Sequence, residues 1–205
     1  MFHVKHEGLT SAAAALGVDL TGEQVRRLGA FEQLLADRAV ALGMIGAADL
    51  PRLRERHVLD CLRAASVVAR LDRSAADIGS GAGLPGIVIA IVRHGLAVTL
   101  VESRQGRAAF LELAAEQLDL PNVTVEHKRV ETISESFDLC FARAFADPER
   151  SWRAAERLLG PAGRLVYFAG SSFDPDRSVP AGAKAVILPA PPVASAGPLV
   201  IMSRQ

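Results

Sequence analysis

The sequence predicts an α/β fold in which a mostly parallel sheet follows a helical extension. From residue 74 onward, short runs rich in β-branched and aliphatic residues alternate with helix-like stretches, which is typical of parallel strands joined by crossover helices. The first 70 residues show helical periodicity instead. We therefore expect residues 1–70 to form an N-terminal helical extension packed on the same domain, and residues 71–205 to form the α/β domain itself.

The helical extension is predicted to hold two amphipathic stretches. Residues 22–44 place apolar side chains at spacings of three, four and seven, which indicates a helix with one buried face, and Thr21 suits its N-cap. Residues 49–71 form the second stretch, with Pro51 in the first turn, where the missing N–H is tolerated. We therefore expect the first 70 residues to be helical.

The strands and the helices between them follow in order. Strand-like runs occupy residues 75–81, 96–103, 122–128, 137–145 and 163–170, and helix-like stretches cover residues 103–120 and 149–160. The last two runs, 183–192 and 197–205, have no helix between them and are predicted to form an antiparallel hairpin. Together these runs give a sheet of seven strands.

Composition excludes several classes of protein. Half of the 205 residues are hydrophobic and the net charge is zero, which argues against binding to nucleic acid by bulk charge but leaves room for a local basic face. No apolar run is long enough for a membrane helix, and no signal peptide is visible, so we expect a cytoplasmic protein without membrane contact. Cys61 and Cys140 stand alone, which predicts buried thiols rather than a disulfide or zinc site. We expect a monomer that holds no metal.

The stretch "ADIGSGAGLPG", Ala76 to Gly86, is the most informative motif. Its glycines allow a sharp turn between strand and helix and a close approach to a ligand. Read from Gly81 it matches the dinucleotide pattern GxGxxG, but the first glycine after the strand is Gly79, which gives D-x-G-x-G-x-G. That frame is typical of S-adenosylmethionine methyltransferases. Glu102, 23 residues after Gly79, ends the second strand of the sheet and can accept hydrogen bonds from both ribose hydroxyls.

The motif alone leaves three classes open. A methyltransferase fits best, because about 130 residues of α/β structure are too few for a dinucleotide domain plus a substrate domain. A nicotinamide-dependent enzyme would use the same acid on its ribose. A non-catalytic binding module would keep the fold without the chemistry.

Five motifs in register make the sequence resemble one family. They are "RHVLDCL" (56–62), "ADIGSGAGLPGI" (76–87), "VES" followed by Arg107, "RVE" (129–131) and "ARAFA" (142–146). Their combination resembles the RsmG family, also called glucose-inhibited division protein B. The resemblance implies a class I S-adenosylmethionine-dependent methyltransferase with a Rossmann-like, mostly parallel seven-stranded sheet. It also implies methylation of N7 of a guanine in 16S ribosomal RNA, with free RNA or the small ribosomal subunit as partner.

The resemblance assigns the residues of the site. It implies that cofactor contacts come from Asp77, Gly79, Ser80, Gly81, Gly83, Leu84, Gly86, Glu102, Ser103, Arg129, Val130, Glu131 and Arg143. It implies that RNA contacts come from Arg104, Arg107, Arg129 and Arg143. Arg143 is also the expected substrate-positioning residue, because an arginine suits the acceptor edge of guanine. No general base is expected, since N7 carries an unprotonated lone pair.

Several positions depart from the family pattern. Arg38-Ala39 stands where the family has Trp-Asn, and Gly43-Met44 where it has Asn-Leu. Ala169 replaces an expected lysine, and Gly197-Pro198 replaces a basic pair. These changes leave open a second interpretation, a diverged paralogue that methylates a small molecule or another RNA. His57 fits either the cofactor pocket or a structural link between helices and sheet.

Overall fold

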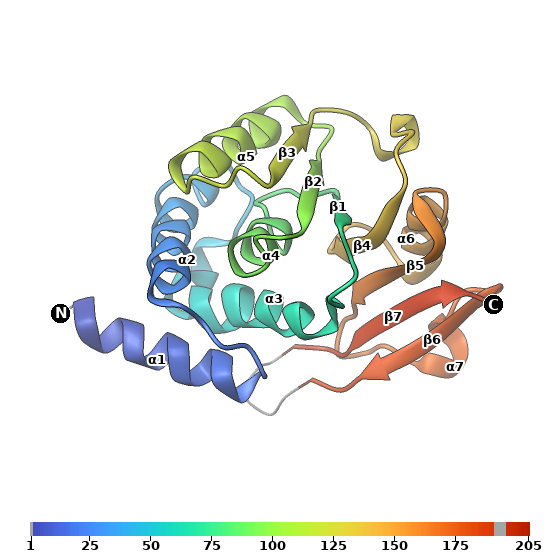
Figure 1. Cartoon of the computed structure of the whole chain (residues 1–205), viewed down its shortest axis with the longest axis horizontal. Coiled ribbons are helices and arrows are strands. Elements are labelled where there is room, and N and C mark those ends of the chain that lie inside the picture. The colour runs from blue at the N-terminus through green and yellow to red at the C-terminus, as the bar shows by residue number, and fades with distance from the viewer. Residues whose placement is uncertain (1, 191–195) are drawn as a thin grey trace.

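A seven-stranded sheet forms the centre of the computed structural model, which describes residues 2–190 and 196–205 (Figure 1). The strands lie in the order β3-β2-β1-β4-β5-β7-β6. Their bounds are β1 (Ser74–Ile78), β2 (Ala97–Val101), β3 (Val123–Glu126), β4 (Phe137–Arg143), β5 (Leu159–Phe168), β6 (Ala183–Leu188) and β7 (Leu199–Arg204). The first five strands are parallel. This confirms the predicted class I methyltransferase fold.

The C-terminal hairpin is also confirmed. Strand β7 pairs antiparallel with both β5 and β6, and β6 lies at the edge of the sheet. Strand β6 ends at Leu188, directly before Pro189, which has no N–H to continue the ladder. Between β5 and β6 the chain forms only the four-residue helix α7 (Pro175–Ser178), because the connection is too short for a crossover helix.

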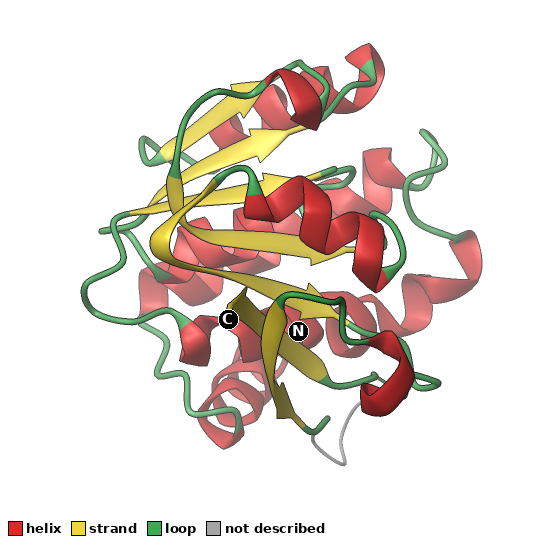
Figure 2. Ribbon diagram, turned by 90° about the vertical axis from the view of Figure 1, so that its right-hand side faces the viewer, coloured by secondary structure: helices red, strands yellow, loops and turns green. Residues whose placement is uncertain are grey.

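Helices lie on both faces of the sheet (Figure 2). The connections between the parallel strands are α4 (Gly86–Val92), α5 (Gln105–Gln117), the 3₁₀ turn η5 (Val130–Thr132) and α6 (Pro148–Glu156). Helix α6 begins where Asp147 accepts a hydrogen bond from the main-chain N–H of Arg150, with Pro148 in its first turn. Among the described residues, no helix is long and apolar enough to cross a membrane.

The helical extension differs from its prediction in detail. It consists of α1 (Phe2–Ala15), α2 (Gly22–Leu34), the π-helical turn η1 (Leu35–Ala39), the 3₁₀ turn η2 (Ala47–Arg52), the π-helical turn η3 (Arg54–Leu59), α3 (Asp60–Arg63) and the 3₁₀ turn η4 (Ala64–Val67). Thr21 caps α2 as predicted, in a reciprocal pair with Gln24. The helical stretch predicted over residues 49–71 is present as one uninterrupted run of helical residues from 47 to 67, although its geometry changes between 3₁₀, π and α along the way.

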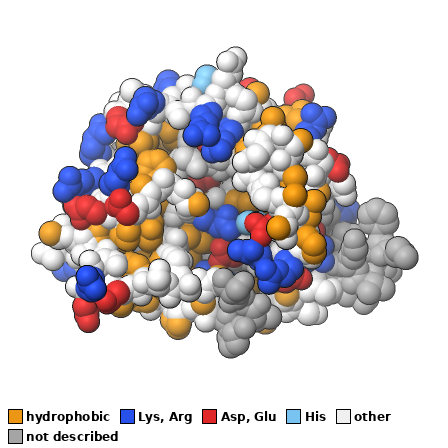
Figure 3. All heavy atoms as spheres, turned by 180° about the vertical axis from the view of Figure 1, so that it is seen from behind, with side chains coloured by type: hydrophobic (Ala, Val, Ile, Leu, Met, Phe, Trp, Pro, Cys, Tyr) orange, Lys and Arg blue, Asp and Glu red, His pale blue; other side chains and the backbone are white. Residues whose placement is uncertain are grey.

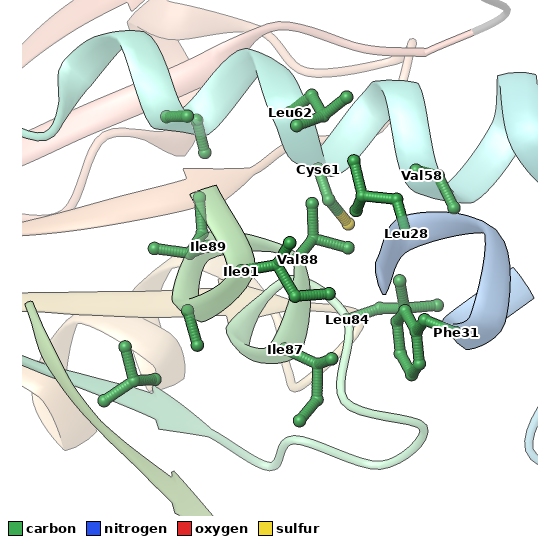
Figure 4. Close-up of a cluster of buried hydrophobic side chains, with 14 of the residues drawn as sticks. Leu28, Phe31, Val58, Cys61, Leu62, Leu84, Ile87, Val88, Ile89 and Ile91 are labelled. Carbon is green, nitrogen blue, oxygen red and sulfur yellow. The ribbon is translucent and has the colours of Figure 1, made fainter. Parts of the chain in front are cut away.

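Two clusters of buried residues cover the two faces of the sheet. One joins alternate residues of the strands to α2, α3 and α4, and the other lies under α6, where Trp152 is fully buried. Figure 4 shows the first cluster, in which Leu28 and Phe31 of α2 meet Leu84 and Ile87. The extension therefore shares its core with the sheet. Both cysteines are free and buried, as predicted.

Candidate active site

The site lies where the strand order reverses. Strands β1 and β4 are neighbours although β2 and β3 come between them in sequence, so their carboxyl ends diverge into connections on opposite sides. The glycine loop leaves β1 here. Gly79, Gly81 and Gly83 all have positive φ (69°, 55° and 81°), a conformation that favours glycine.

Gly79 also makes room for an aromatic ring. A Cβ atom at this position would lie 2.5 Å from Cδ2 of Phe145, so only glycine allows the ring to lie directly on the loop. Phe145 follows β4 and Gly79 follows β1, so the contact joins the two strands at the switch point. Ala144, which precedes Phe145, has a φ of 54°, unusual for a residue with a side chain.

Asp77, at the penultimate position of β1, is a buried carboxyl. Its Oδ2 accepts a 3.0 Å hydrogen bond from the main-chain N–H of Gly86, which fixes the start of α4. Burial raises the pKa of Asp77 to about 7, and the bond from Gly86 offsets part of that rise. Asp77 therefore fixes the end of the glycine loop where helix α4 begins.

Glu102 follows β2 and faces the loop from the side. One carboxylate oxygen accepts a 3.0 Å bond from the N–H of Gly81, and the other accepts a 2.8 Å bond from the N–H of Arg104. Each oxygen keeps a second lone pair, so the pair can still accept the two hydroxyls of a ribose. Because these main-chain donors fix the carboxylate, Glu102 is oriented before any ligand arrives.

A cavity of about 130 Å³ lies beside Glu102. It is lined by Gly79, Val101, Glu102, Ser103, Lys128, Arg129, Val130, Glu131 and Phe145. Glu131 and Arg129 are exposed and 3.6 Å apart, whereas Val130 is buried beneath them. The lining combines an oriented carboxylate, an aromatic ring and an apolar floor. These groups fit an adenosine moiety.

A second, larger cavity of about 530 Å³ lies beyond the end of β4. Its lining comes from the helical extension, β4, β5 and the segment before β7: Met44, Ile45, Gly46, Asp49, Arg56, His57, Asp60, Arg63, Arg143, Ala144, Tyr167, Phe168, Ala169, Gly170, Ser171, Ala196 and Gly197. Figure 3 shows a hollow on the rear face in which basic, acidic and histidine side chains meet. Residues 143–145 separate the two cavities: Arg143 and Ala144 line the larger one and Phe145 the smaller one.

Arg143 is held within the larger cavity by the helical extension. Its Nε donates to Oδ2 of Asp60 (3.1 Å), and its Nη2 donates to the carbonyl of Arg56 (3.1 Å) and to Nδ1 of His57 (2.9 Å). Asp60 also accepts a 2.5 Å bond from Nη2 of Arg63 through its other oxygen. One buried carboxylate thus orients two guanidinium groups.

His57 is neutral in this arrangement. Nδ1 accepts from Arg143, so its proton lies on Nε2, which is 3.6 Å from Oδ2 of Asp49. Burial and the neighbouring Arg143 lower the pKa of His57 below its ordinary value. The structure places His57 between the helices and the sheet, in line with the structural role considered from the sequence, and at the wall of the larger cavity rather than the smaller one beside Glu102.

The predicted site residues are partly brought together. Most of those assigned to the cofactor surround the loop or line the smaller cavity. Leu84 belongs to the loop, but its side chain is buried in the core against α2 (Figure 4), and Arg143 lines the larger cavity instead. Arg107 lies near Gly81, with Nη1 3.9 Å from the position of a Cβ there, whereas Arg104 and Arg129 are exposed at the rim.

Sequence reasoning missed three residues of the larger cavity: Asp49, Asp60 and Arg63. Asp60 lies within the "RHVLDCL" motif, but the motif does not indicate that its carboxylate binds two arginines. Its partner Arg143 is 83 positions away in the chain, and no local pattern links them. Three of the departures noted earlier also lie here, since Met44, Ala169 and Gly197 line this cavity.

Comparison with known proteins identifies the family. Residues 24–177 match the family model GidB, described as rRNA small subunit methyltransferase G. The chain belongs to this family. Within the GidB family, curated relatives named ribosomal RNA small subunit methyltransferase G include one from Polaromonas naphthalenivorans, 38% identical over 76% of this chain and 74% of the relative. One from Corynebacterium diphtheriae is 37% identical over 83% and 77%, and one from a Nocardioides species is 41% identical over 69% and 57%.

Solved structures support the fold of this GidB member. The mitomycin 7-O-methyltransferase MmcR matches 85% of the chain and 60% of its own length, with a TM-score of 0.63 and 17% identity. A mutant of MtNAS in complex with S-adenosylmethionine covers 98% of the chain and 78% of its own length, with a TM-score of 0.59 and 17% identity. At such low identity these likenesses establish the class I methyltransferase fold.

Proposed function

We propose that the protein transfers a methyl group from S-adenosylmethionine to N7 of a guanine in 16S ribosomal RNA. The observation that carries this proposal is the pairing of two cavities at the switch point: one holds the oriented carboxylate of Glu102, and the next holds the guanidinium of Arg143. Membership of the GidB family and the names of its relatives support the ribosomal substrate.

The proposed cofactor fits the residues at the first cavity. Glu102 would accept the ribose hydroxyls, and the glycine loop would allow close approach of the methionine end. The cofactor supplies an electrophilic methyl group on a sulfonium. The chain itself would bind and orient, because in-line methyl transfer depends on the placement of two reactants.

The charged groups of the larger cavity support guanine N7 as the acceptor. Both oxygens of Asp60 accept from arginines and Nδ1 of His57 accepts from Arg143, so neither residue is placed to remove a proton. N7 requires no general base, and Arg143 would position the acceptor edge of the guanine. Arg104, Arg107 and Arg129 would contact the RNA backbone around the mouth.

Mapping N7-methylguanine in 16S RNA tests this proposal. In a strain that lacks the gene, borohydride and aniline cleavage should lose one position, and the wild-type gene should restore it. A gene carrying Glu102→Ala should not. Retention of every modified guanine in the deletion strain would refute the ribosomal assignment.

A small-molecule acceptor is the second candidate. Its support is the wall of the larger cavity at Ala169 and Gly197, which carries no charge to meet RNA. Methyl transfer by purified protein to undermethylated small subunits, but not to a small-molecule extract, would favour RNA. The reverse result would favour this alternative.

A further inference from the structure

The larger cavity carries one positive charge in excess. Three arginines and two aspartates line it: Arg56, Arg63, Arg143, Asp49 and Asp60. The neutral form of His57, set by the hydrogen bond from Arg143, adds none. Arg56 pairs with Asp49 at 2.5 Å, so the excess belongs to the group around Asp60.

Arg63 is the residue whose charge is least matched. Only 7% of it is exposed, and its Nη2 is shared between Asp60 (2.5 Å) and the carbonyl of Gly197 (3.1 Å). Among residues 8–190 and 196–205, none accepts a hydrogen bond from its Nε, which is fully buried, or from its Nη1. Asp60 cannot neutralise both Arg63 and Arg143. A ligand cannot reach the fully buried Nε, so Nη1 is the donor left for a further acceptor in the cavity, and an unpaired guanidinium donor is unfavourable until one meets it.

The geometry around Arg63 is rigid. Gly197 approaches the end of β5 so closely that a Cβ there would lie 2.2 Å from the carbonyl oxygen of Ala169. This contact fixes the Gly197 carbonyl that holds Arg63, while Asp60 holds the guanidinium from α3. The donors are therefore oriented in advance of any ligand.

We propose that this cavity is an oxyanion site, in which Arg63 beside Arg143 binds a carboxylate or a phosphodiester with a single negative charge. The proposal deepens the proposed function, and rests on it for the two ligands it names: the carboxylate of the cofactor's methionine end and a phosphate of the RNA. Both present the planar or tetrahedral oxygens that arginine pairs recognise.

Three variants test the assignment. Arg63→Met removes the charge with little change in length, and Asp60 keeps Arg143 as its partner. Arg63→Lys keeps a charge but loses the fork of donors. Arg164→Met is the control, because Arg164 forms a partly buried pair with Asp72 (2.7 Å). Arg164 pairs with Leu139 in the sheet, four residues from Arg143 toward the opposite end of β4.

Three probes separate the sources of the anion. S-adenosylhomocysteine carries the carboxylate, 5′-methylthioadenosine lacks it, and inorganic phosphate needs neither cofactor nor RNA. If the carboxylate is the ligand, Arg63→Met should weaken S-adenosylhomocysteine at least about tenfold and leave 5′-methylthioadenosine within about twofold. If a phosphodiester is the ligand, both nucleosides should bind as in wild type. The salt slope of binding to a 16S RNA fragment should then fall by about one.

In either case inorganic phosphate should raise the melting temperature of wild type and of Arg164→Met more than that of Arg63→Met, with Arg63→Lys between them. The phosphate effect on the melting temperature does not require that 16S RNA be the substrate. Failure of the proposed function can therefore be told apart from failure of the oxyanion site. The oxyanion site is refuted if folded Arg63→Met protein matches Arg164→Met with all these ligands.

Discussion

Asp77 is a carboxyl group in a position where its charge is unfavourable. It is buried beneath the glycine loop and its pKa in the folded protein is about 7, against an ordinary value of 3.8. The folded state therefore binds the proton more tightly than the unfolded state between these two values. The contribution of this group to stability is full below about pH 4 and is lost as the pH rises through about 7.

Replacing Asp77 with Asn should remove this pH dependence. Asn can still accept the bond from Gly86 but cannot ionise. Between pH 5 and 8, the free energy of unfolding of wild type should fall by about 2 to 3 kcal/mol relative to Asp77→Asn, because the wild-type carboxyl must become charged while buried. Urea denaturation across this range measures the difference. Parallel pH profiles for the two proteins would contradict the raised pKa.

Glu102 shows the opposite combination, an oriented acceptor at the cavity wall. Glu102→Gln replaces one carboxylate oxygen by an NH₂ group, which is a donor and cannot accept the hydrogen bond from the N–H of Gly81 or Arg104. The change also removes the negative charge that would accept the ribose hydroxyls. We expect affinity for S-adenosylhomocysteine to fall about 10-fold to 100-fold, as for loss of hydrogen bonds to a charged group. Calorimetry measures this, with Glu149→Gln as the control, because the Glu149 side chain on α6 is 47% exposed. Equal affinities for Glu102→Gln and wild type would remove Glu102 from the site.

The sequence pointed to individual site residues only where a chemically suitable side chain follows directly after a predicted strand. The glycines of the loop and Glu102 follow strands directly, so strand-end rules place them. The group of Asp60, Arg63 and Arg143 depends on contacts between the extension and the end of β4, which only the folded chain brings together. Leu84 is assigned to the cofactor by its place in the motif, and its side chain faces the core, so any contact with a cofactor would come from its main chain.

Among the elements, the strands were predicted better than the helices of the extension. Parallel strands buried on both faces have a simple apolar signature, whereas residues 49–71 combine Pro51 with buried charged residues such as Asp60. That segment stays helical over residues 47–67 but changes between 3₁₀, π and α geometry, and it forms long-range pairs such as Arg54 with Glu32 of α2. Local periodicity does not encode such pairs.

Helix α4 illustrates how closely the elements approach one another. A Cβ on Gly86 would lie 2.2 Å from Cδ2 of Leu100 and 2.7 Å from Oδ2 of Asp77. Gly86→Ala should therefore lower the free energy of unfolding by about 1 to 3 kcal/mol through overpacking, and disturb the loop as well. Urea denaturation gives the value.

Gly106, near the start of α5, is the matched control for that change. No atom lies within 4 Å of a Cβ placed there, so Gly106→Ala should leave stability unchanged or raise it by up to about 1 kcal/mol. If the two alanine variants were equally stable, the close packing of α4 on β1 and β2 would be wrong.

The extension and the sheet form one core, which has a consequence for the unfolding of the chain. Leu28 and Phe31 of α2 pack with Leu84 and Ile87 at the start of α4, so neither part buries its apolar surface alone (Figure 4). Trp152, the one tryptophan of the sequence, lies in the other cluster, under α6. No described residue of the extension belongs to that cluster, so the fluorescence of Trp152 reports on the sheet and α6.

We expect the whole chain to unfold in a single transition. In urea, the fluorescence of Trp152 and the far-UV circular dichroism of the helices should share one midpoint, because loss of the extension exposes the apolar face of α4 and releases the sheet. A fragment of residues 71–205 should accordingly show no cooperative transition, since its first buried cluster is left open to water. Separate midpoints for the two signals, or a fragment that unfolds cooperatively, would instead mean that the extension is an independent unit.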